Sequence, residues 1–177
     1  PEFVPIHRAT HEGKTIVGDN CLIMAYCHIA HNCKVGDGVI MANATTFGGY
    51  VEVGNGAIFG GMVVVHQNTT IGRLCMLSGM TGARVDLPPF STCDGRPAMV
   101  RGLNIIGMRR SKMGSKTRAA LKQAFKLLYK SGMNYSQAIE KIESEMADVP
   151  EAIELCQFYK NSKRGVAVAM SSETTST

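Results

Sequence analysis

An apolar residue returns at every sixth position along residues 17–88, and this period constrains the fold more than any other feature of the chain. It passes through Val17, Ile23, Ile29, Val35, Met41, Phe47, Val53, Phe59, Val65, Ile71, Leu77 and Ala83. Because apolar residues make up 45% of the chain, twelve successive hits in one phase would arise by chance about once in ten thousand trials. The period therefore predicts a repeat architecture built from hexads.

The other positions of each hexad agree with this phase. The residue after the apolar one is Gly, Ala or Ser in nine of twelve repeats, and the residue four after it is Cys, Val, Thr or Ala in all but the last. This pattern is typical of a parallel β-helix, whose narrow interior takes large aliphatic residues alongside small or β-branched ones. Three hexads make one triangular coil of 18 residues, so residues 17–88 predict four coils. Gly, Asn and Asp at residues 18–20, 36–38 and 54–56 are expected to supply the positive φ of the corners.

Stacked strands lie about 4.8 Å apart, so each residue is expected directly above the one 18 positions later. Two columns of polar or small residues follow from this rule: His31, Gly49 and Gln67 in one, and Asn32, Tyr50 and Asn68 in the other. A histidine that titrates near neutrality is a natural general base, and a glycine N–H one coil away suits a developing oxyanion. The alternative is that His31 is an exposed residue at a coil corner.

Composition divides the chain into two parts. Most of the 19 glycines lie before residue 115, whereas Ala, Leu, Lys and Glu gather after it. We expect coils over residues 1–90 and a helical domain over residues 91–177, with a disordered tail from about residue 171. The coils are expected to end at Leu87-Pro88-Pro89, because consecutive prolines cannot donate ladder hydrogen bonds.

Turn and cap residues predict the segments outside the coils. Residues 1–16 are expected to be extended, with a loop at residues 11–14 that breaks the hexad phase. Helices are expected from Arg96-Pro97 to Gly114, from residue 116 to 130 after the cap Ser115, from residue 135 to 147 after the cap Asn134, and from Pro150 to about Lys160.

The net charge of +5 is modest, and the basic residues cluster within residues 96–110 and 112–130. Without interleaved aromatic residues or a reader motif, this charge favours phosphate or an acidic protein as a partner over nucleic acid. A solvated helix face would explain the same charges.

The positions of the cysteines and the hydropathy of the chain indicate the cellular compartment in which we expect the protein. Cys21, Cys27 and Cys33 occupy the inward small position of successive hexads on three different faces. This placement favours buried free thiols over a metal site and fits a reducing cytosol. No apolar run approaches a membrane span and no signal peptide stands at the start, so we expect a soluble protein without a transmembrane segment.

Five strings resemble one known family: Asn20 to His31 (NCLIMAYCHIAH), Ile58 to Gln67 (IFGGMVVVHQ), Asp86 to Phe90, Gly102 to Arg110, and Ser162 to Gly165. Their order over residues 2–165 is similar to the acyl-(acyl-carrier-protein):UDP-N-acetylglucosamine O-acyltransferases that begin lipid A synthesis. The resemblance implies a left-handed parallel β-helix, an exception to right-handed crossovers, followed by an α-helical C-terminal domain in a homotrimer with active sites between subunits. It also implies cytoplasmic transfer of a 3-hydroxyacyl chain from acyl-carrier protein to the 3-hydroxyl of UDP-N-acetylglucosamine, without a metal or other cofactor.

The resemblance also implies roles for single residues. His31 matches the family's catalytic base and Gly49 its oxyanion donor, with Asn32 beside the base. The residues expected to bind substrate are His28, Tyr50, His66, Gln67, Asn104 and Arg110, of which the last two match the nucleotide and diphosphate contacts. Gly79 and Met80, one or two coils beyond the His face, are expected at the floor of the acyl-chain pocket. The acidic acyl-carrier protein is expected to bind the basic surface of residues 112–130.

Four positions depart from the family pattern. Asn32 stands where the family usually has Asp, Tyr50 where it has His, Asn68 where it has an aromatic residue, and Ile106 where some members have Glu. Losing the carboxylate beside the base removes a group that raises its basicity, so we expect weaker activity, although an amide can still orient the ring. The family's first half, with the acidic residue that engages the sugar hydroxyl, has no counterpart here. Since the chain begins at Pro1 without Met, we expect the preceding coils to have been cut away or lost.

Two other functions remain open at this point. A truncated, non-catalytic hexapeptide trimer that binds a nucleotide sugar or a protein partner is favoured by Asn32, Tyr50 and the missing coils. A carbonic-anhydrase-like trimer would hold zinc between subunits, and His28, His31 and His66 supply enough imidazoles. The continuous match elsewhere favours the acyltransferase over the zinc trimer.

Overall fold

Each hexad forms one two-residue strand that ends on the apolar residue of the period, in a computed structural model that describes residues 2–170. The strands are β1 (Ile16–Val17), β2 (Leu22–Ile23), β3 (His28–Ile29), β4 (Lys34–Val35), β5 (Ile40–Met41), β6 (Thr46–Phe47), β7 (Glu52–Val53), β8 (Ile58–Phe59), β9 (Val64–Val65), β10 (Thr70–Ile71), β11 (Met76–Leu77) and β12 (Gly82–Ala83). From β3 onward the second residue is buried while the first faces outward. The tail expected to be disordered from about residue 171 lies outside the described residues.

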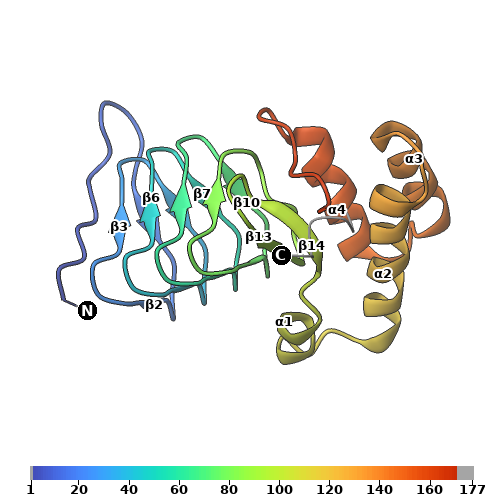
Figure 1. The fold of residues 1–177 in the computed structure, drawn as a ribbon, viewed down its shortest axis with the longest axis horizontal. Coiled ribbons are helices and arrows are strands. Elements are labelled where there is room, and N and C mark those ends of the chain that lie inside the picture. The colour runs from blue at the N-terminus through green and yellow to red at the C-terminus, as the bar shows by residue number, and fades with distance from the viewer. Residues whose placement is uncertain (1, 171–177) are drawn as a thin grey trace, which may run out of the picture.

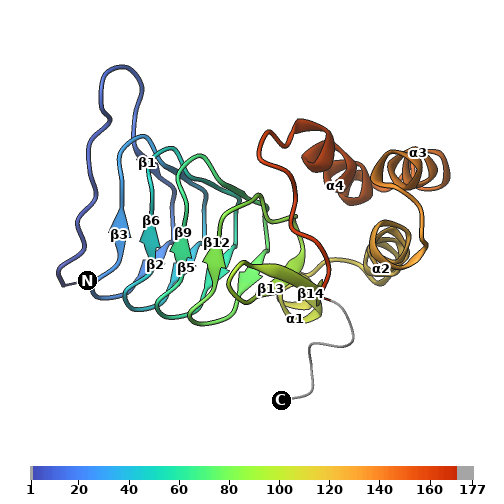
Figure 2. The same cartoon turned by 45° about the horizontal axis from the view of Figure 1, so that its top comes forward.

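Strands three hexads apart pair in parallel, and their register is 18 residues. Leu22 pairs with Ile40, and His28 pairs with Thr46. Within residues 2–170 the pairs form three sheets, in the orders β1-β4-β7-β10, β12-β9-β6-β3 and β14-β13-β11-β8-β5-β2, where β13 is Ser91–Asp94 and β14 is Met99–Leu103. The stacking rule is therefore confirmed. The fold is the expected left-handed parallel β-helix of about four coils, followed by α-helices (Figures 1 and 2).

The interior of the prism is filled by the inward residues of all three faces. Phe47 and Phe59 pack with their ring centroids 4.8 Å apart and their planes at 61°. Cys27 and Cys33 are fully buried and carry free thiols, as predicted, whereas the free thiol of Cys21 is only partly buried. Burial raises the pKa of both thiols, so they stay protonated and act as small apolar residues.

The corners have positive φ, but not only at Gly, Asn and Asp. Asn32 and Asn68 adopt it as that chemistry predicts, and Tyr50, Met62 and Met80 do so as well, at φ values of 58°, 60° and 63°. Positive φ costs a residue with a Cβ roughly 1–2 kcal/mol. A hydrogen bond to the coil before holds each of these corners: Tyr50 N to His31 O at 3.0 Å, Met62 N to Asn43 O at 2.9 Å, and Met80 N to Gly61 O at 2.8 Å.

The coils do not end at Pro88-Pro89 as predicted. β13 (Ser91–Asp94) continues the sheet of β11 in parallel, and β14 (Met99–Leu103) pairs with β13 in antiparallel. The helix expected from Arg96-Pro97 to Gly114 exists only as Ile105–Arg110, and its predicted start is wrong because Arg96 and Pro97 form the turn between the two strands. Cys93 and Val100 are buried on the inner side of this hairpin, and their burial outweighs the helical signal of Pro97.

Four helices follow the hairpin: α1 (Ile105–Arg110), α2 (Ser115–Lys130), α3 (Tyr135–Glu145) and α4 (Pro150–Asn161). The capping box of Asn134 and Gln137 before α3 is confirmed. The cap of α2 is Gly114 rather than Ser115, which is the first helical residue. α2, α3 and α4 pack together beyond the last coil through buried residues such as Leu121, Ile142 and Leu155 (Figure 2). Across residues 2–170, no helix combines the length and the apolar character needed to cross a membrane.

One arginine links the coils to the helices. The Nε atom of Arg73, at a corner of the last coils, donates to both carboxylate oxygens of Glu154 in α4 at 2.9 and 2.7 Å. Its guanidinium also lies 4.7 Å from the ring centroid of Phe90. These contacts hold α4 against the end of the solenoid.

We predict that Gly54→Ala lowers the free energy of unfolding by about 1–3 kcal/mol, because overpacked sites of this kind cannot relax without a backbone shift. A Cβ at Gly54 would lie 2.4 Å from the backbone nitrogen of Arg73 on the next coil. Gly61→Ala is the matched control, since its nearest neighbour would be Asn43 O at 3.5 Å. Urea unfolding of the two variants measures the difference, and equal midpoints would contradict the packing argument.

Candidate active site

His31 lies at the corner that follows β3, and its ring is held between residues of its own coil and the next. The ring of Tyr50 meets it edge-on, with centroids 5.2 Å apart and planes at 89°. Tyr50 N donates to His31 O, so the two corners stack as the 18-residue rule predicts. The imidazole is half-buried, which leaves part of it open to a ligand.

The neighbouring amide determines which nitrogen of His31 carries a proton. Asn32 Nδ2 donates to Glu12 O at 3.0 Å, and Asn32 Oδ1 accepts from Thr10 N at 3.0 Å. These two backbone contacts leave only one orientation for the amide. Asn32 Oδ1 therefore faces His31 Nδ1 at 3.0 Å as an acceptor, and Nδ1 must be the protonated nitrogen. The lone pair of the neutral imidazole is then on Nε2.

The loop of residues 7–15 closes over this pair, and sequence analysis did not find its contribution. The hydroxyl of Thr10 donates to Asn32 Oδ1 at 3.2 Å and lies 3.2 Å from His31 Nδ1. Thr15 Oγ1 accepts from Asn32 N at 2.9 Å. The 18-residue rule fails here because the loop breaks the hexad phase. The phase break itself was the only signal in the sequence that this loop exists.

Gly49 lies directly under the His31 ring and is buried. A Cβ at Gly49 would come within 2.6 Å of His31 Cε1 and 2.8 Å of Nε2, so only glycine lets the ring occupy this place. Among the residues that the structure describes, the Gly49 N–H donates no hydrogen bond. A backbone donor without a partner thus lies beside the unprotonated nitrogen of His31.

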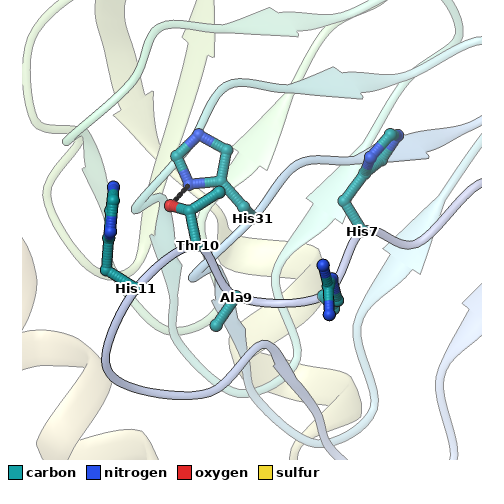
Figure 3. Close-up of a pocket in the computed structure, with 6 residues that line it drawn as sticks. His7, Ala9, Thr10, His11 and His31 are labelled. Atoms are coloured by element: carbon teal, nitrogen blue, oxygen red, sulfur yellow. Dashed lines mark hydrogen bonds between the residues drawn. The ribbon is translucent and has the colours of Figure 1, made fainter.

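A pocket of about 530 Å³ opens between the loop and this corner. Its lining residues are His7, Arg8, Ala9, Thr10, His11 and His31, and Figure 3 shows the hydrogen bond between His31 Nδ1 and the Thr10 hydroxyl in its wall. His7 and His11 are exposed, and His7 also packs against His28 with ring centroids 4.9 Å apart. The lining contains no carboxylate, so the pocket favours neutral or negatively charged groups.

His28, His66 and Gln67 lie along the same part of the prism. His28 is half-buried in β3, and its Nδ1 has no hydrogen-bond partner within residues 2–170. His66 and Gln67 are exposed at the corner after β9, one coil beyond Gly48 and Gly49. The structure thus brings the predicted histidines to one edge of the prism.

Asn104 and Arg110 are not part of this edge within one chain. Both belong to the end of the molecule that carries α1, far along the solenoid from β3 (Figure 1). Asn104 is buried and caps α1, because its Oδ1 accepts from Gly107 N at 2.8 Å and its Nδ2 donates to Leu74 O at 2.9 Å. Arg110 is exposed in the last turn of α1.

Gly79 and Met80 lie at a different corner of the prism from His31. Their corner separates the sheets of β11 and β12, whereas the His31 corner separates those of β3 and β4. Met80 exposes 55% of its surface, next in its column to Met62 at 56%. In the described part of one chain, no group of three or more His, Cys, Asp or Glu residues could hold a metal ion, so a zinc site would need several subunits.

Two family models match the chain. The model described as "Udp N-acetylglucosamine O-acyltransferase; Domain 2" covers residues 86–167, and the model "Bacterial transferase hexapeptide (six repeats)" covers residues 14–49. The first match contains the hairpin and the helices, and the second contains the corner of His31.

Curated proteins named acyl-[acyl-carrier-protein]--UDP-N-acetylglucosamine O-acyltransferase are similar to most of the chain. The protein from a Synechocystis species is 46% identical over 80% of this chain, and the one from Thermodesulfovibrio yellowstonii is 42% identical over 93% of it. The chain spans only 51% and 65% of the lengths of these two proteins.

Solved structures agree with these relatives. A UDP-N-acetylglucosamine O-acyltransferase from Moraxella catarrhalis superposes with a TM-score of 0.88 at 34% identity, covering 93% of this chain and 65% of its own. A UDP-N-acetylglucosamine acyltransferase from Campylobacter jejuni superposes with a TM-score of 0.86 at 32% identity, covering 96% of this chain and 69% of its own.

We predict that Gly49→Ala displaces the His31 ring at little cost in stability. The added Cβ would meet side-chain atoms that can rotate away, whereas the Cβ in Gly54→Ala would meet the backbone. The urea midpoint should therefore fall less than for Gly54→Ala. The ¹⁵N chemical shift of His31 Nδ1 should change, because a displaced ring loses the bond to Asn32. An unchanged Nδ1 shift would show that the ring does not lie over Gly49.

Proposed function

The chain belongs to the UDP-N-acetylglucosamine O-acyltransferase family, and from this membership we propose that it transfers a 3-hydroxyacyl chain from acyl-carrier protein to UDP-N-acetylglucosamine. The acceptor is the sugar 3-hydroxyl, and the product begins lipid A synthesis. The observation that carries this proposal is the pairing of His31, with its lone pair on Nε2, and the unpaired N–H of Gly49. The free cysteines of the described residues support a reducing, cytoplasmic setting.

In this proposal His31 is the general base. Nε2 takes the proton of the sugar 3-hydroxyl while the oxygen attacks the thioester carbonyl carbon. The carbonyl oxygen becomes an oxyanion, and the N–H of Gly49 donates to it. When the tetrahedral intermediate collapses, the carbon–sulfur bond breaks and the proton on Nε2 passes to the leaving thiolate. His31 returns to its neutral form, so the cycle needs no other acid or base.

Asn32 and Thr10 orient the His31 ring, and neither residue brings a charge beside it. A carboxylate at position 32 would stabilise the imidazolium, whereas an amide offers only a dipole. The amide is anchored on the backbone of Thr10 and Glu12, so it fixes the ring and its tautomer firmly. We therefore propose a correctly oriented but weaker base than a His–Asp pair supplies.

The active unit is proposed to be a homotrimer with the site between subunits. In the longest sheet, the outward residues of β2, β5, β8 and β11 are all apolar, which favours burial against another copy: Leu22, Ile40, Ile58 and Met76. The sheet of β4 and β7 instead presents an ion pair between Lys34 and Glu52 at 2.6 Å, as expected of a solvated face. A neighbouring subunit would also bring Asn104 and Arg110 towards the nucleotide and place Gly79 and Met80 at the end of the acyl chain.

Acyl-carrier protein is proposed to bind the helical domain. Lys122 and Lys126 are exposed on α2 and line a hollow of about 570 Å³ beside α3. Lys116 and Lys130 extend the positive surface towards both ends of the helix. Such a surface attracts an acidic carrier at long range and sets its orientation.

A second candidate function is a non-catalytic trimer that binds a nucleotide sugar or a protein partner. The neutral Asn32 favours it, because the base lacks the carboxylate that the family usually has. The two candidates differ in one measurement. Binding of UDP-N-acetylglucosamine without any acyl transfer would support the second candidate over the first.

We predict that His31→Ala lowers acyl transfer by roughly a hundred- to ten-thousand-fold, the usual contribution of a general base. The fold should be kept, because His31 lies outside the inward layer and its loss leaves no core cavity. The matched control is His11→Asn, which changes a histidine of the same pocket at a position with positive φ that Asn tolerates. Thioester consumption by each variant tests the prediction, and wild-type turnover in His31→Ala would contradict it.

We predict that Asn32→Asp moves the acid limb of the kcat/KM profile to higher pH, because a carboxylate favours the charged imidazolium. The sign follows from the base being active only when neutral, so a more basic ring loses its proton at higher pH. The variant should be less stable by about 1 kcal/mol, since the carboxylate cannot donate to Glu12 O. A pH–rate profile identical to that of the wild type would contradict the electrostatic role of this position.

A further inference from the structure

His66 has a second neighbour that sequence analysis did not connect to it. Arg164, 98 residues further along the chain, places its Nη2 3.3 Å from His66 Nδ1. The same guanidinium donates from Nε and Nη2 to Arg84 O at 3.1 and 2.9 Å. Arg164 is half-buried, so its head is fixed rather than free in solvent.

The segment that carries Arg164 is itself anchored on the coils. Residues 162–170 run back from α4 and pair with the solenoid at Asp86 and Val100 (Figure 2). Asp86 is 3% exposed, and its carboxylate accepts from Ser162 Oγ at 2.6 Å and from Thr70 N at 2.8 Å. The backbone of Asp86 also bonds Gly165 O and Ala167 N. These contacts on both sides of Arg164 hold its side chain beside His66 before any ligand binds.

The contact with Arg164 fixes the tautomer of His66. A guanidinium carries only donors and keeps its charge, so a hydrogen bond between Arg164 and His66 requires that Nδ1 accepts and carries no proton. The competing partner of Nδ1 is Gln67 O at 3.1 Å, which would require a proton on the same atom. That arrangement would set two N–H groups against each other. The carbonyl of Gln67, an exposed residue, can bond water instead, so the contact with Arg164 prevails.

We propose that Arg164 is a positioning residue that keeps His66 in its Nε2–H tautomer, so that the two histidines beside Gly48-Gly49 have opposite hydrogen-bonding roles. His31, stacked on Gly49, accepts at Nε2. His66, one coil beyond Gly48, donates from Nε2 to an acceptor oxygen of the acyl-transfer substrates. This division prevents His66 from competing as a base. The effect on turnover rests on the proposed function, whereas the tautomer of His66 does not.

The test is the tautomeric state of the histidines in full-length protein labelled with ¹⁵N-histidine. Long-range ¹H–¹⁵N spectra at about pH 8.5, where an ordinary imidazole is neutral, distinguish Nδ1–H from Nε2–H. The His66 signals are assigned by their loss in His66→Gln. We expect Nε2–H at His66 and Nδ1–H at His31 in the wild type. A proton on Nδ1 of His66 would overturn the proposal without any variant.

Variants of the anchored segment test the cause. Arg164→Met keeps the stem and removes the donors, so His66 should shift to Nδ1–H and bond Gln67 O. Acyl transfer, measured as kcat/KM, should then fall about tenfold, the typical effect of losing one oriented hydrogen bond. Arg164→Lys should retain Nε2–H, because an ammonium is also only a donor. Retention of Nε2–H in Arg164→Met would overturn the proposal.

The matched control is Lys163→Met, which removes the same charge from the adjacent residue. Lys163 is exposed and makes no hydrogen bond or ion pair with the rest of residues 2–170. Lys163→Met should leave both the tautomer of His66 and the turnover unchanged. An effect equal to that of Arg164→Met would show that any lost positive charge has this effect, and would overturn the proposal. If the wild type shows the expected tautomers but transfers no acyl group, the proposed function fails while the assignment of His66 stands.

Discussion

The in-register hydrogen-bond ladder between coils is the constraint on which the rest of the structure depends. Each coil bonds the next through contacts such as Tyr50 N to His31 O and Asn68 N to Gly49 O, at 3.0 and 2.9 Å. Because the register is 18 residues without slippage, the column neighbours of each corner side chain are fixed by the sequence. The His31 ring over Gly49 is a direct result, since the column offers space there only if residue 49 lacks a Cβ.

The hexad period predicted the strands, the register and the columns, because these depend on local pattern alone. It therefore also predicted that His31 and Gly49 lie together. The period could not predict Thr10 or Arg164, whose segments lie outside the hexads and reach the site only through tertiary docking. The hairpin of β13 and β14 was missed for a related reason, because burial of Cys93 and Val100 decides its conformation against the helical signal of Pro97.

The ladder also separates residues that the proposed active site would need together. Four coils at about 4.8 Å per coil place the α1 end of the prism roughly 20 Å from the His31 end. Asn104 uses both its amide oxygen and its amide nitrogen to close the junction between α1 and the coils. These bonds fix the side chain of Asn104 at the start of α1, the helix that carries Arg110. A rigid solenoid cannot bend to join its two ends, and a second chain is the simple way to bring them together.

The hexad repeat determines where His31 and His66 lie, and two segments outside the repeat determine which of their ring nitrogens can donate. The loop of residues 7–15 orients the Asn32 amide, so the lone pair of His31 is on Nε2 and the side chain that bonds Nδ1 is neutral. The segment of residues 162–170 sets a permanent cation against Nδ1 of His66. In the proposed mechanism, a neutral acceptor beside one imidazole makes it a base, and a cation beside the other makes it a hydrogen-bond donor. Because Thr10 and Arg164 are not buried in the core, these two side chains can change without altering it, whereas a change of register would move both histidines at once.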